Sequence, residues 1–221
     1  MIDWTPFLLS FKLAAISTTI LFCLVTPLAY FMARVNFRFK SVIEAIFSLP
    51  LVLPPTVLGF YMLIFFSPYS FLGEFFEKNF DIRLVFNFTG LVIASCIYSL
   101  PFVFQPMSAG FKSMPNSLIE ASYSLGKGRA KTLFFVVLPH IKASILSALI
   151  ISFAHTLGEF GVVLMIGGSV DGDTKVASIA IYEAVELLDY NLAHIYSGIM
   201  LAISFSVLLI VFATNQKIAK L

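Results

Sequence analysis

Long apolar runs constrain the fold of this chain more than any other feature. A helix needs about 20 mostly apolar residues to cross the hydrocarbon core of a bilayer. Of the 221 residues, 59% are hydrophobic and only 12% are charged, which is more apolar surface than a water-soluble domain of this size can bury. We therefore predict an all-α integral membrane protein. Five runs are long enough to cross: Leu9–Met32, Ile46–Phe66, Leu91–Ala109, Ile145–Gly167 and Ile195–Ala213.

A sixth apolar segment, Val176–Leu188, is shorter and carries Glu183 and Glu186. It predicts an amphipathic helix that lies at the membrane surface or dips back into the bilayer. No Lys or Arg precedes Lys12, so the first run lacks the basic start of a signal peptide and is expected to be retained. With no repeat or low-complexity tract in the sequence, residues 1–221 are expected to form one transmembrane domain.

Basic residues are concentrated in alternate connections between the runs. Cytoplasmic loops of membrane proteins carry an excess of Lys and Arg. The charges therefore predict that the N-terminus lies outside, that the C-terminus lies inside and that the number of spans is odd. Ten of the fourteen basic residues fall on the predicted inner side: Arg34, Arg38, Lys40, Lys112, Lys127, Arg129, Lys131, Lys142, Lys217 and Lys220. The net charge of +2 does not indicate nucleic-acid binding.

The longest cytoplasmic connection, residues 110–142, predicts two short helices. Ser117 and Glu120 have the spacing of a capping box, in which each side chain bonds the backbone amide of the other. The first helix should then run to Leu125 and end at Gly126, because glycine accepts the left-handed conformation of a helix end. The connection would thus form a hairpin across the cytoplasmic mouth.

The second helix of this hairpin is predicted at about Ala130–Val137, ending before Pro139. In the first helix, the small residues Ala121 and Ser122 would let the surface of another protein approach closely. A capped helix is also rigid enough to transmit a push. The alternative is that Glu120 only caps a surface helix.

This connection resembles the EAA loop of bacterial ABC importer permeases. The family pattern is Glu-Ala-Ala, three residues, Gly, nine residues and Ile-x-Leu-Pro, and both spacings are met, with Ser122 and Val136 as mild replacements. The resemblance implies a type I importer permease whose first hairpin helix sits in a groove of a cytoplasmic ATPase subunit. It assigns ATPase coupling to Ser117, Glu120, Ala121, Ser122, Gly126, Leu138 and Pro139.

Three further segments resemble oxyanion permeases. The stretch HTLGEFGVVLMIGG, from His155, contains an LGEFG element like that shared by molybdate and sulfate permeases. The stretches GEFFEKNFDIRLVFNFTG and GDTKVASIAIYEAVE resemble segments of molybdate permeases. The resemblance implies a molybdate permease subunit in the bacterial inner membrane, with tungstate or sulfate as alternative cargo. It also implies three partners besides membrane lipid: a second copy, two cytoplasmic ATPases and a periplasmic oxyanion-binding protein.

His155 and Glu159 are candidate pathway residues. They are four residues apart, which would place them on one helix face of the fourth run, and ionisable groups at membrane depth are functional candidates. Because a carboxylate repels an anion, we expect Glu159 to shape a gate, held by His155, backbone amides or a neighbouring helix. A substrate-ligand role and proton coupling are the alternatives. Gly158 and Gly161 would allow close helix packing or a kink.

Prolines interrupt two of the predicted spans. Pro50, Pro54 and Pro55 lie in the second run, and Pro101 and Pro106 lie in the third. Proline removes a backbone hydrogen bond and bends a helix. These positions are therefore either ordinary kinks or hinges that line the pathway, and Pro54 and Pro55 are gate candidates.

Other classes of function are less consistent with the sequence. It contains no GxxxxGK[ST] phosphate-binding loop, so ATP is expected to bind the partner ATPase, and no cofactor or metal is expected in this chain. An intramembrane enzyme would use His155 and Glu159 as an acid–base pair, yet no GxSxG, HExxH or CxxC accompanies them. A stand-alone channel is the other rival. Cys23 and Cys96 lie in apolar runs and are expected to act as small hydrophobes.

Overall fold

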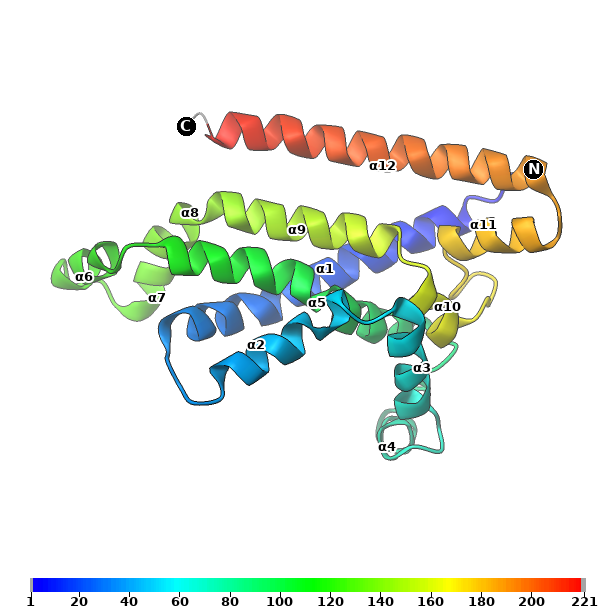
Figure 1. Cartoon of the computed structure of the whole chain (residues 1–221), viewed down its shortest axis with the longest axis horizontal. Helices are drawn as coiled ribbons and strands as arrows, with labels where there is room; N and C mark the ends of the chain where they lie inside the picture. The colour runs from blue at the N-terminus through cyan, green and yellow to red at the C-terminus, as the bar shows by residue number, and fades with distance from the viewer. Residues whose placement is uncertain (1, 220–221) are drawn as a thin grey trace.

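Three long apolar helices form the frame of the computed structural model, which describes residues 2–219. They are α1 (Thr5–Arg34), α5 (Phe88–Ser113) and α12 (Tyr190–Ala219), and each is long and apolar enough to cross a membrane. They correspond to the first, third and fifth predicted spans. Figure 1 shows that these helices run along the long axis of the molecule, together with α9 (Lys142–Leu157).

The second predicted span is broken rather than continuous. Helix α2 (Lys40–Ser48) and the 3-10 turn η1 (Leu49–Leu51) lead into α3 (Pro55–Phe66), and the chain bends by 109° between them. Pro54 adopts an extended backbone before α3 begins at Pro55, because these prolines cannot continue the preceding helix. The predicted interruption of the run Ile46–Phe66 by its prolines is therefore confirmed, and it is a sharp break in the chain.

The fourth predicted span is also interrupted. Helix α9 ends at Leu157, and the short helix α10 (Gly161–Gly167) follows after a break. At its inner end, α9 is bent by 74° from the preceding segment, Arg129–His140. If each bent pair counts as one span, the described residues contain five spans, which agrees with the predicted number.

The prolines of α5 behave differently from those before α3. Pro101 and Pro106 lie inside α5, and the helix continues through both. Pro101 is buried, and α5 packs against α1 and α9 along its length. Neighbouring helices tolerate a missing backbone hydrogen bond inside a membrane bundle, so these prolines do not interrupt the third span.

Helix α11 (Ala177–Glu186) packs one side against the outer end of the bundle and exposes the other, as expected of an amphipathic helix. Its residues Ala177 and Ile179 are fully buried, and the Ala177 amide donates a 2.9 Å hydrogen bond to Ser10 Oγ of α1. At its polar side, Glu183 pairs with Lys175 at 2.5 Å, and this hydrogen bond raises the pKa of the Lys175 ammonium. Helix α11 is thus held by contacts with α1 and α12.

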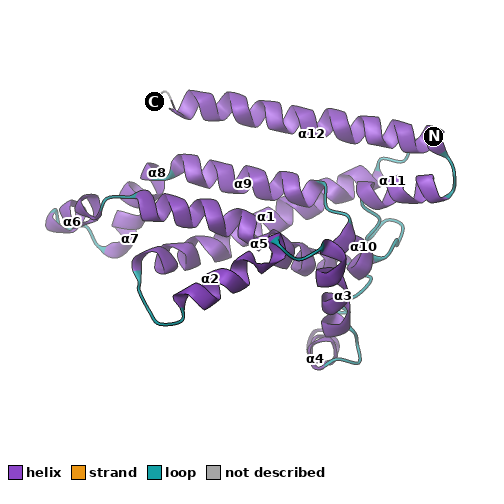
Figure 2. Ribbon diagram, in the orientation of Figure 1, coloured by secondary structure: helices purple, strands orange, loops and turns teal. Residues whose placement is uncertain are grey.

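The remaining helices lie outside the central bundle or connect its parts. Figures 1 and 2 show α3 and α4 projecting to one side, and α6 and α7 at one end of the long axis. The elements are α4 (Phe71–Phe80), α6 (Asn116–Ser124), α7 (Arg129–Thr132), the π-helical turn η2 (Leu133–Val137) and α8 (Leu138–His140).

Two main apolar clusters hold the bundle together, one in each half. The outer cluster includes Leu13, Leu91 and Ile166, and the inner cluster includes Phe104 and Val137. Inside a bilayer, such clusters stabilise the bundle by close van der Waals packing rather than by removing apolar surface from water. Because Val137 belongs to the hairpin of residues 110–142, this hairpin is anchored in the core of the inner half.

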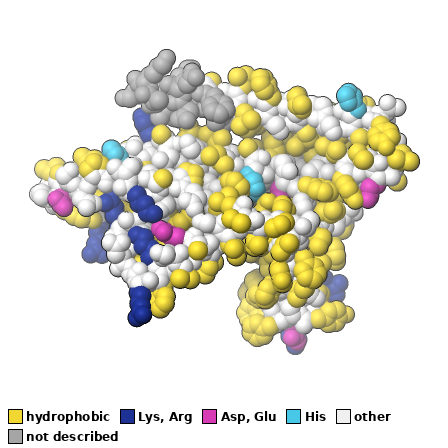
Figure 3. All heavy atoms as spheres, in the orientation of Figure 1, with side chains coloured by type: hydrophobic (Ala, Val, Ile, Leu, Met, Phe, Trp, Pro, Cys, Tyr) yellow, Lys and Arg dark blue, Asp and Glu magenta, His cyan; other side chains and the backbone are white. Residues whose placement is uncertain are grey.

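Lys and Arg side chains gather at the end that carries α6 and α7 (Figure 3). The predicted inner connections, residues 34–40 and 112–142, both lie there. By the positive-inside rule this end faces the cytoplasm, and α1 begins at the outer end. Lys220 lies outside the described residues, and the side chain of Lys217 is not described either.

Candidate functional site

Helix α6 begins two residues earlier than the sequence predicts. It starts at Asn116, with Pro115 at the N-cap position, and it has no side-chain cap hydrogen bond in the described structure. The predicted capping box of Ser117 and Glu120 is therefore wrong. The helix starts directly after Pro115, whose backbone is extended, so Ser117 is already the second helical residue and cannot cap it. Both Ser117 and Glu120 are exposed.

The predicted end of this helix is confirmed. Gly126 has a φ of +75°, which is the left-handed conformation, and its amide donates to the Tyr123 carbonyl at 2.9 Å. The next amide, of Lys127, donates to the Ser122 carbonyl at 3.1 Å. Glycine adopts this conformation without the strain that a Cβ atom brings, which explains a glycine at the turn of the hairpin.

A buried hydrogen bond locks the two arms of the hairpin together. Ser122 Oγ and Thr132 Oγ1 lie 2.9 Å apart, and both side chains are buried. The close approach that the small Ser122 permits is therefore to α7 of the same chain. Ala121, by contrast, is exposed on the surface of α6.

The return arm of the hairpin is longer than predicted. It continues from α7 through η2 into α8, which contains Pro139, so the prediction that it ends before Pro139 is wrong. Pro139 lies in the first turn of α8, directly after the π-helical turn η2. Leu138 packs against the inner cluster, next to the fully buried Val137.

The exposed face of α6 carries apolar side chains that the sequence reasoning missed. Leu118 and Tyr123 are exposed, and Leu125 is 79% exposed. Such side chains at the end of a bundle, beyond the lipid, indicate a protein interface. The sequence does contain a signal for this exposed apolar face. Leu118 and Leu125 are seven residues apart, which places both on one face of a helix.

The second candidate region is a cavity of about 580 Å³ at the point where α9 ends. It brings together five of the predicted pathway residues, while Pro54 lies beside it at the start of α3. Tyr98 lies ten residues after the start of α5, about 15 Å along the helix, which places the cavity inside the membrane. The lining consists of Pro55, Thr56, Tyr98, Ala154, His155, Gly158, Glu159, Phe160 and Gly161.

Four lining residues, Thr56, Tyr98, Ala154 and Phe160, were not predicted. For Tyr98 a signal exists in the sequence, because Ser95 and Ser99 lie three residues before it and one after it in an otherwise apolar run. Polar residues at helical spacing in a membrane span form a polar face. Thr56 reaches the cavity only because the chain turns at Pro54, which no local pattern shows.

His155 bonds to α5 rather than to Glu159. Its Nδ1 lies 3.0 Å from Ser99 Oγ, and Ser99 Oγ lies 2.9 Å from Thr156 Oγ1. The imidazole ring is stacked on Phe102 with centroids 3.9 Å apart. Because α9 ends at Leu157, Glu159 has left the helix, and the prediction that both residues share one helix face is wrong.

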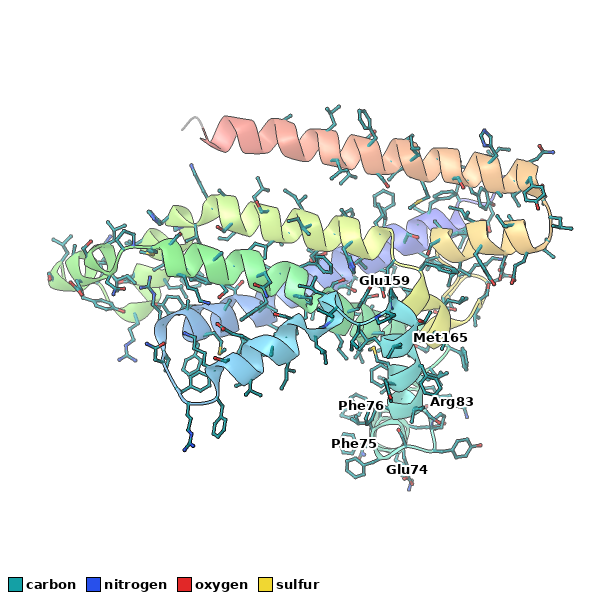
Figure 4. The ribbon with its side chains drawn as sticks, viewed as in Figure 1. Glu74, Phe75, Phe76, Arg83, Glu159 and Met165 are labelled. Carbon is teal, nitrogen blue, oxygen red and sulfur yellow. The ribbon has the colours of Figure 1, made fainter. Side chains whose placement is uncertain are left out.

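Glu159 is 5% exposed and lies in the break between α9 and α10 (Figure 4). Within residues 2–219, neither of its carboxylate oxygens has a hydrogen-bond partner, and neither does the buried Ser95 Oγ. Its backbone is held on both sides. The amide donates to the Thr156 carbonyl at 3.3 Å, and the carbonyl accepts a 2.7 Å hydrogen bond from Ser178 Oγ of α11.

Helices α3 and α10 meet at the cavity through two glycines. A Cβ atom on Gly161 would lie 2.7 Å from Pro55 Cβ, and one on Gly59 would lie 2.9 Å from Met165 Cβ. Figure 4 shows Met165 on α10 beside α3. Gly158 is different, because the nearest atom to an added Cβ there is 3.8 Å away. Close packing therefore depends on Gly161 and not on Gly158.

Comparisons with known proteins agree on one family. The model of the binding-protein-dependent transport system inner membrane component matches residues 25–219. The molybdenum transport system permease protein ModB of Azotobacter vinelandii is 40% identical over 97% of this chain and 95% of its own length. The sulfate transport system permease protein CysT of Salmonella typhimurium is 30% identical over 85% of this chain and 66% of its own length.

A solved structure shows the same fold. A chain of a bacterial ABC transporter involved in alginate import superposes with a TM-score of 0.79, covering 96% of this chain and 78% of that chain at 16% sequence identity. A bundle with broken spans and a basic helical hairpin thus defines a membrane-spanning importer subunit of the type I fold. The chain belongs to the family of binding-protein-dependent transport system inner membrane components. It is a non-catalytic, multi-pass protein of the bacterial inner membrane.

Proposed function

We propose that this chain is the permease subunit of an ABC importer that moves molybdate across the inner membrane. One observation carries the proposal: the 40% identity to a molybdenum permease extends over 97% of the chain, hairpin and cavity included. Tungstate has the same shape and charge and is the alternative cargo. Sulfate is the other, because of the similarity to a sulfate permease.

The cavity supports a pathway formed by two copies of the chain. Its lining includes exposed residues, Pro55, Thr56 and Gly158, at a depth where a single copy would expose them to lipid. Non-helical backbone at membrane depth is stable only when protein or a water-filled cavity surrounds it. A second copy facing the cavity would enclose it, and a periplasmic binding protein would deliver the anion to the outer end.

The hairpin supports coupling to two cytoplasmic ATPases. The exposed residues Leu118, Glu120 and Leu125 form the surface that an ATPase would grip. The Ser122–Thr132 hydrogen bond and the buried Val137 make the hairpin rigid with respect to the inner core. A displacement of α6 would therefore pass through α8 into α9, and from there to the break beside the cavity.

The direct test is uptake of isotope-labelled molybdate by cells that lack this chain and by the same cells after complementation. The proposal predicts that uptake returns with the chain, and that unlabelled tungstate competes strongly while sulfate competes weakly. Sulfate as the stronger competitor would instead identify a sulfate importer. Absence of any oxyanion uptake, with the chain inserted and its ATPase present, would contradict the proposal.

Coupling is tested at Gly126, which faces open space because no atom lies within 4 Å of an added Cβ. Gly126→Trp should insert normally but abolish uptake and co-purification of the ATPase, because the indole ring blocks the partner surface. Gly126→Ala adds only the left-handed strain, about 1–2 kcal/mol, and should keep most of the uptake. Undiminished uptake by Gly126→Trp would count against a coupling role for α6.

A further inference from the structure

An apolar groove lies between α1 and the return arm of the hairpin, in the inner half of the molecule. Its volume is about 360 Å³, more than twice the roughly 150 Å³ of an apolar protein cavity that takes up benzene. The α1 wall includes Phe22, Pro27 and Tyr30, and the opposite wall consists of Leu133, Phe134 and Leu138. This groove is separate from the cavity beside Glu159.

The groove has a physical origin in two irregular helices. Pro27 lies inside α1 and removes one backbone hydrogen bond of that helix. The opposite wall begins in the π-helical turn η2, which is wider than an α-helix. Regular helices pack by fitting ridges of side chains into grooves, and two helices with these irregularities leave a hollow between them.

The orientation of the return arm places the groove at the inner surface of the bilayer. The segment Arg129–His140 is inclined by 74° to the membrane-crossing α9, so it lies nearly parallel to the membrane plane. Phe134 and Phe135 are 62% and 72% exposed on it. Aromatic side chains on a helix in this position lie among the lipid chains near the headgroups.

The start of the hairpin arm, which we call the rim of the groove, carries basic side chains and no acidic ones. Arg129 and Lys131 are exposed one turn before Leu133 and Phe134, and Lys127 and Lys142 flank the arm. Residues 121–142 contain no Asp or Glu. Basic side chains just inside the membrane attract anionic headgroups, and basic pockets between helices on the cytoplasmic side bind such lipids.

We propose that this groove binds an anionic phospholipid of the inner leaflet. One acyl chain lies between Tyr30 and Phe134, and the phosphate headgroup lies at Arg129 and Lys131. The lipid would fill the space between α1 and the hairpin arm and contact both. The proposal rests on the apolar lining, the membrane depth and the charge of the rim, and it does not depend on which anion is transported.

Tryptophan fluorescence can test the site because the chain contains a single tryptophan, Trp4, at the opposite end of α1. In a Trp4→Phe background, Phe134→Trp places the only reporter in the groove. The purified full-length chain is placed in phosphatidylcholine vesicles that contain increasing fractions of brominated phosphatidylglycerol or of brominated phosphatidylcholine. Bromine atoms on an acyl chain quench an indole ring that they contact.

The expected result is half-maximal quenching at an approximately 25-fold lower fraction of phosphatidylglycerol than of phosphatidylcholine, since each of the two basic residues near the surface contributes about fivefold. Arg129→Gln with Lys131→Gln should remove most of this preference. Leu201→Trp is the matched control, because Leu201 is an exposed residue of α12 outside the groove and should be quenched equally by both lipids.

Tyr30→Trp, on the α1 wall, provides a second reporter if Phe134→Trp does not fold. Equal quenching by both lipids at both positions would overturn the proposal, as would a preference that survives the loss of both basic side chains. Absence of quenching by either lipid would show that protein, such as a second copy, covers the groove, and would also overturn it. None of these readings requires transport, so they are independent of the proposed function.

Discussion

Glu159 is the residue whose surroundings are hardest to reconcile with an ordinary structural carboxylate. Burying an ionised group without a partner lowers the stability of the fold by several kcal/mol. The backbone of Glu159 is hydrogen-bonded, but its carboxylate is not. His155, four residues earlier, is engaged with Ser99 of α5 instead. The geometry therefore favours a role for the volume and backbone of Glu159 in shaping the cavity.

This role predicts that Glu159→Gln transports nearly normally. Glutamine keeps the volume and the backbone contacts, so molybdate uptake should stay within about twofold of the wild type at every pH, whereas Glu159→Ala, which removes the volume, should lower it strongly. Uptake is measured from pH 6 to pH 8. Loss of uptake, or of its pH dependence, in Glu159→Gln alone would instead support proton coupling.

At the scale of elements, the two broken spans are linked to one another. Helix α3 turns away at Pro54, helix α10 begins after Glu159, and the two helices meet through Gly59 and Gly161. A movement of α9 would thus displace α3 through α10, although α9 and α3 belong to different spans. The contact between α3 and α10 is the part of the cavity wall most sensitive to side-chain size.

Gly161→Ala should therefore be much more harmful than Gly158→Ala. The added Cβ at residue 161 would overlap Pro55, and overpacking of this kind destabilises a protein by about 1–3 kcal/mol. At residue 158 the nearest atoms are 3.8 Å and 3.9 Å away, so the change should stay within about 0.5 kcal/mol. Thermal unfolding in detergent measures both variants. A stable Gly161→Ala chain with normal uptake would refute the packing argument.

The hairpin shows which local features a sequence reveals. The left-handed turn at Gly126 was predictable because a single residue type determines it. The capping box failed because Pro115 sets the start of α6 before Ser117 can act as a cap. The helical arm through Pro139 was missed because proline is acceptable in a first turn, and only the preceding π-helical turn makes residue 138 a new start.

At the scale of the whole molecule, hydropathy and charge were sufficient for the all-α class and the number of spans. Both depend on short stretches of sequence. The sideways course of α3 and the break at Glu159 depend on contacts between distant segments, such as Gly59 with Met165 and Glu159 with Ser178. The same holds for the cavity, whose residues come from four separate helices and the break. Five of them were foreseen: Pro55, His155, Gly158, Glu159 and Gly161.

The interruption of two helices within the bilayer has an electrical consequence. Water that reaches the broken backbone conducts ions, so the membrane voltage falls mainly across the part of the protein that stays dry. Moving one elementary charge across 100 mV involves about 2.3 kcal/mol, and a dianion about twice that. Because the cell interior is negative, an incoming dianion moves against this field.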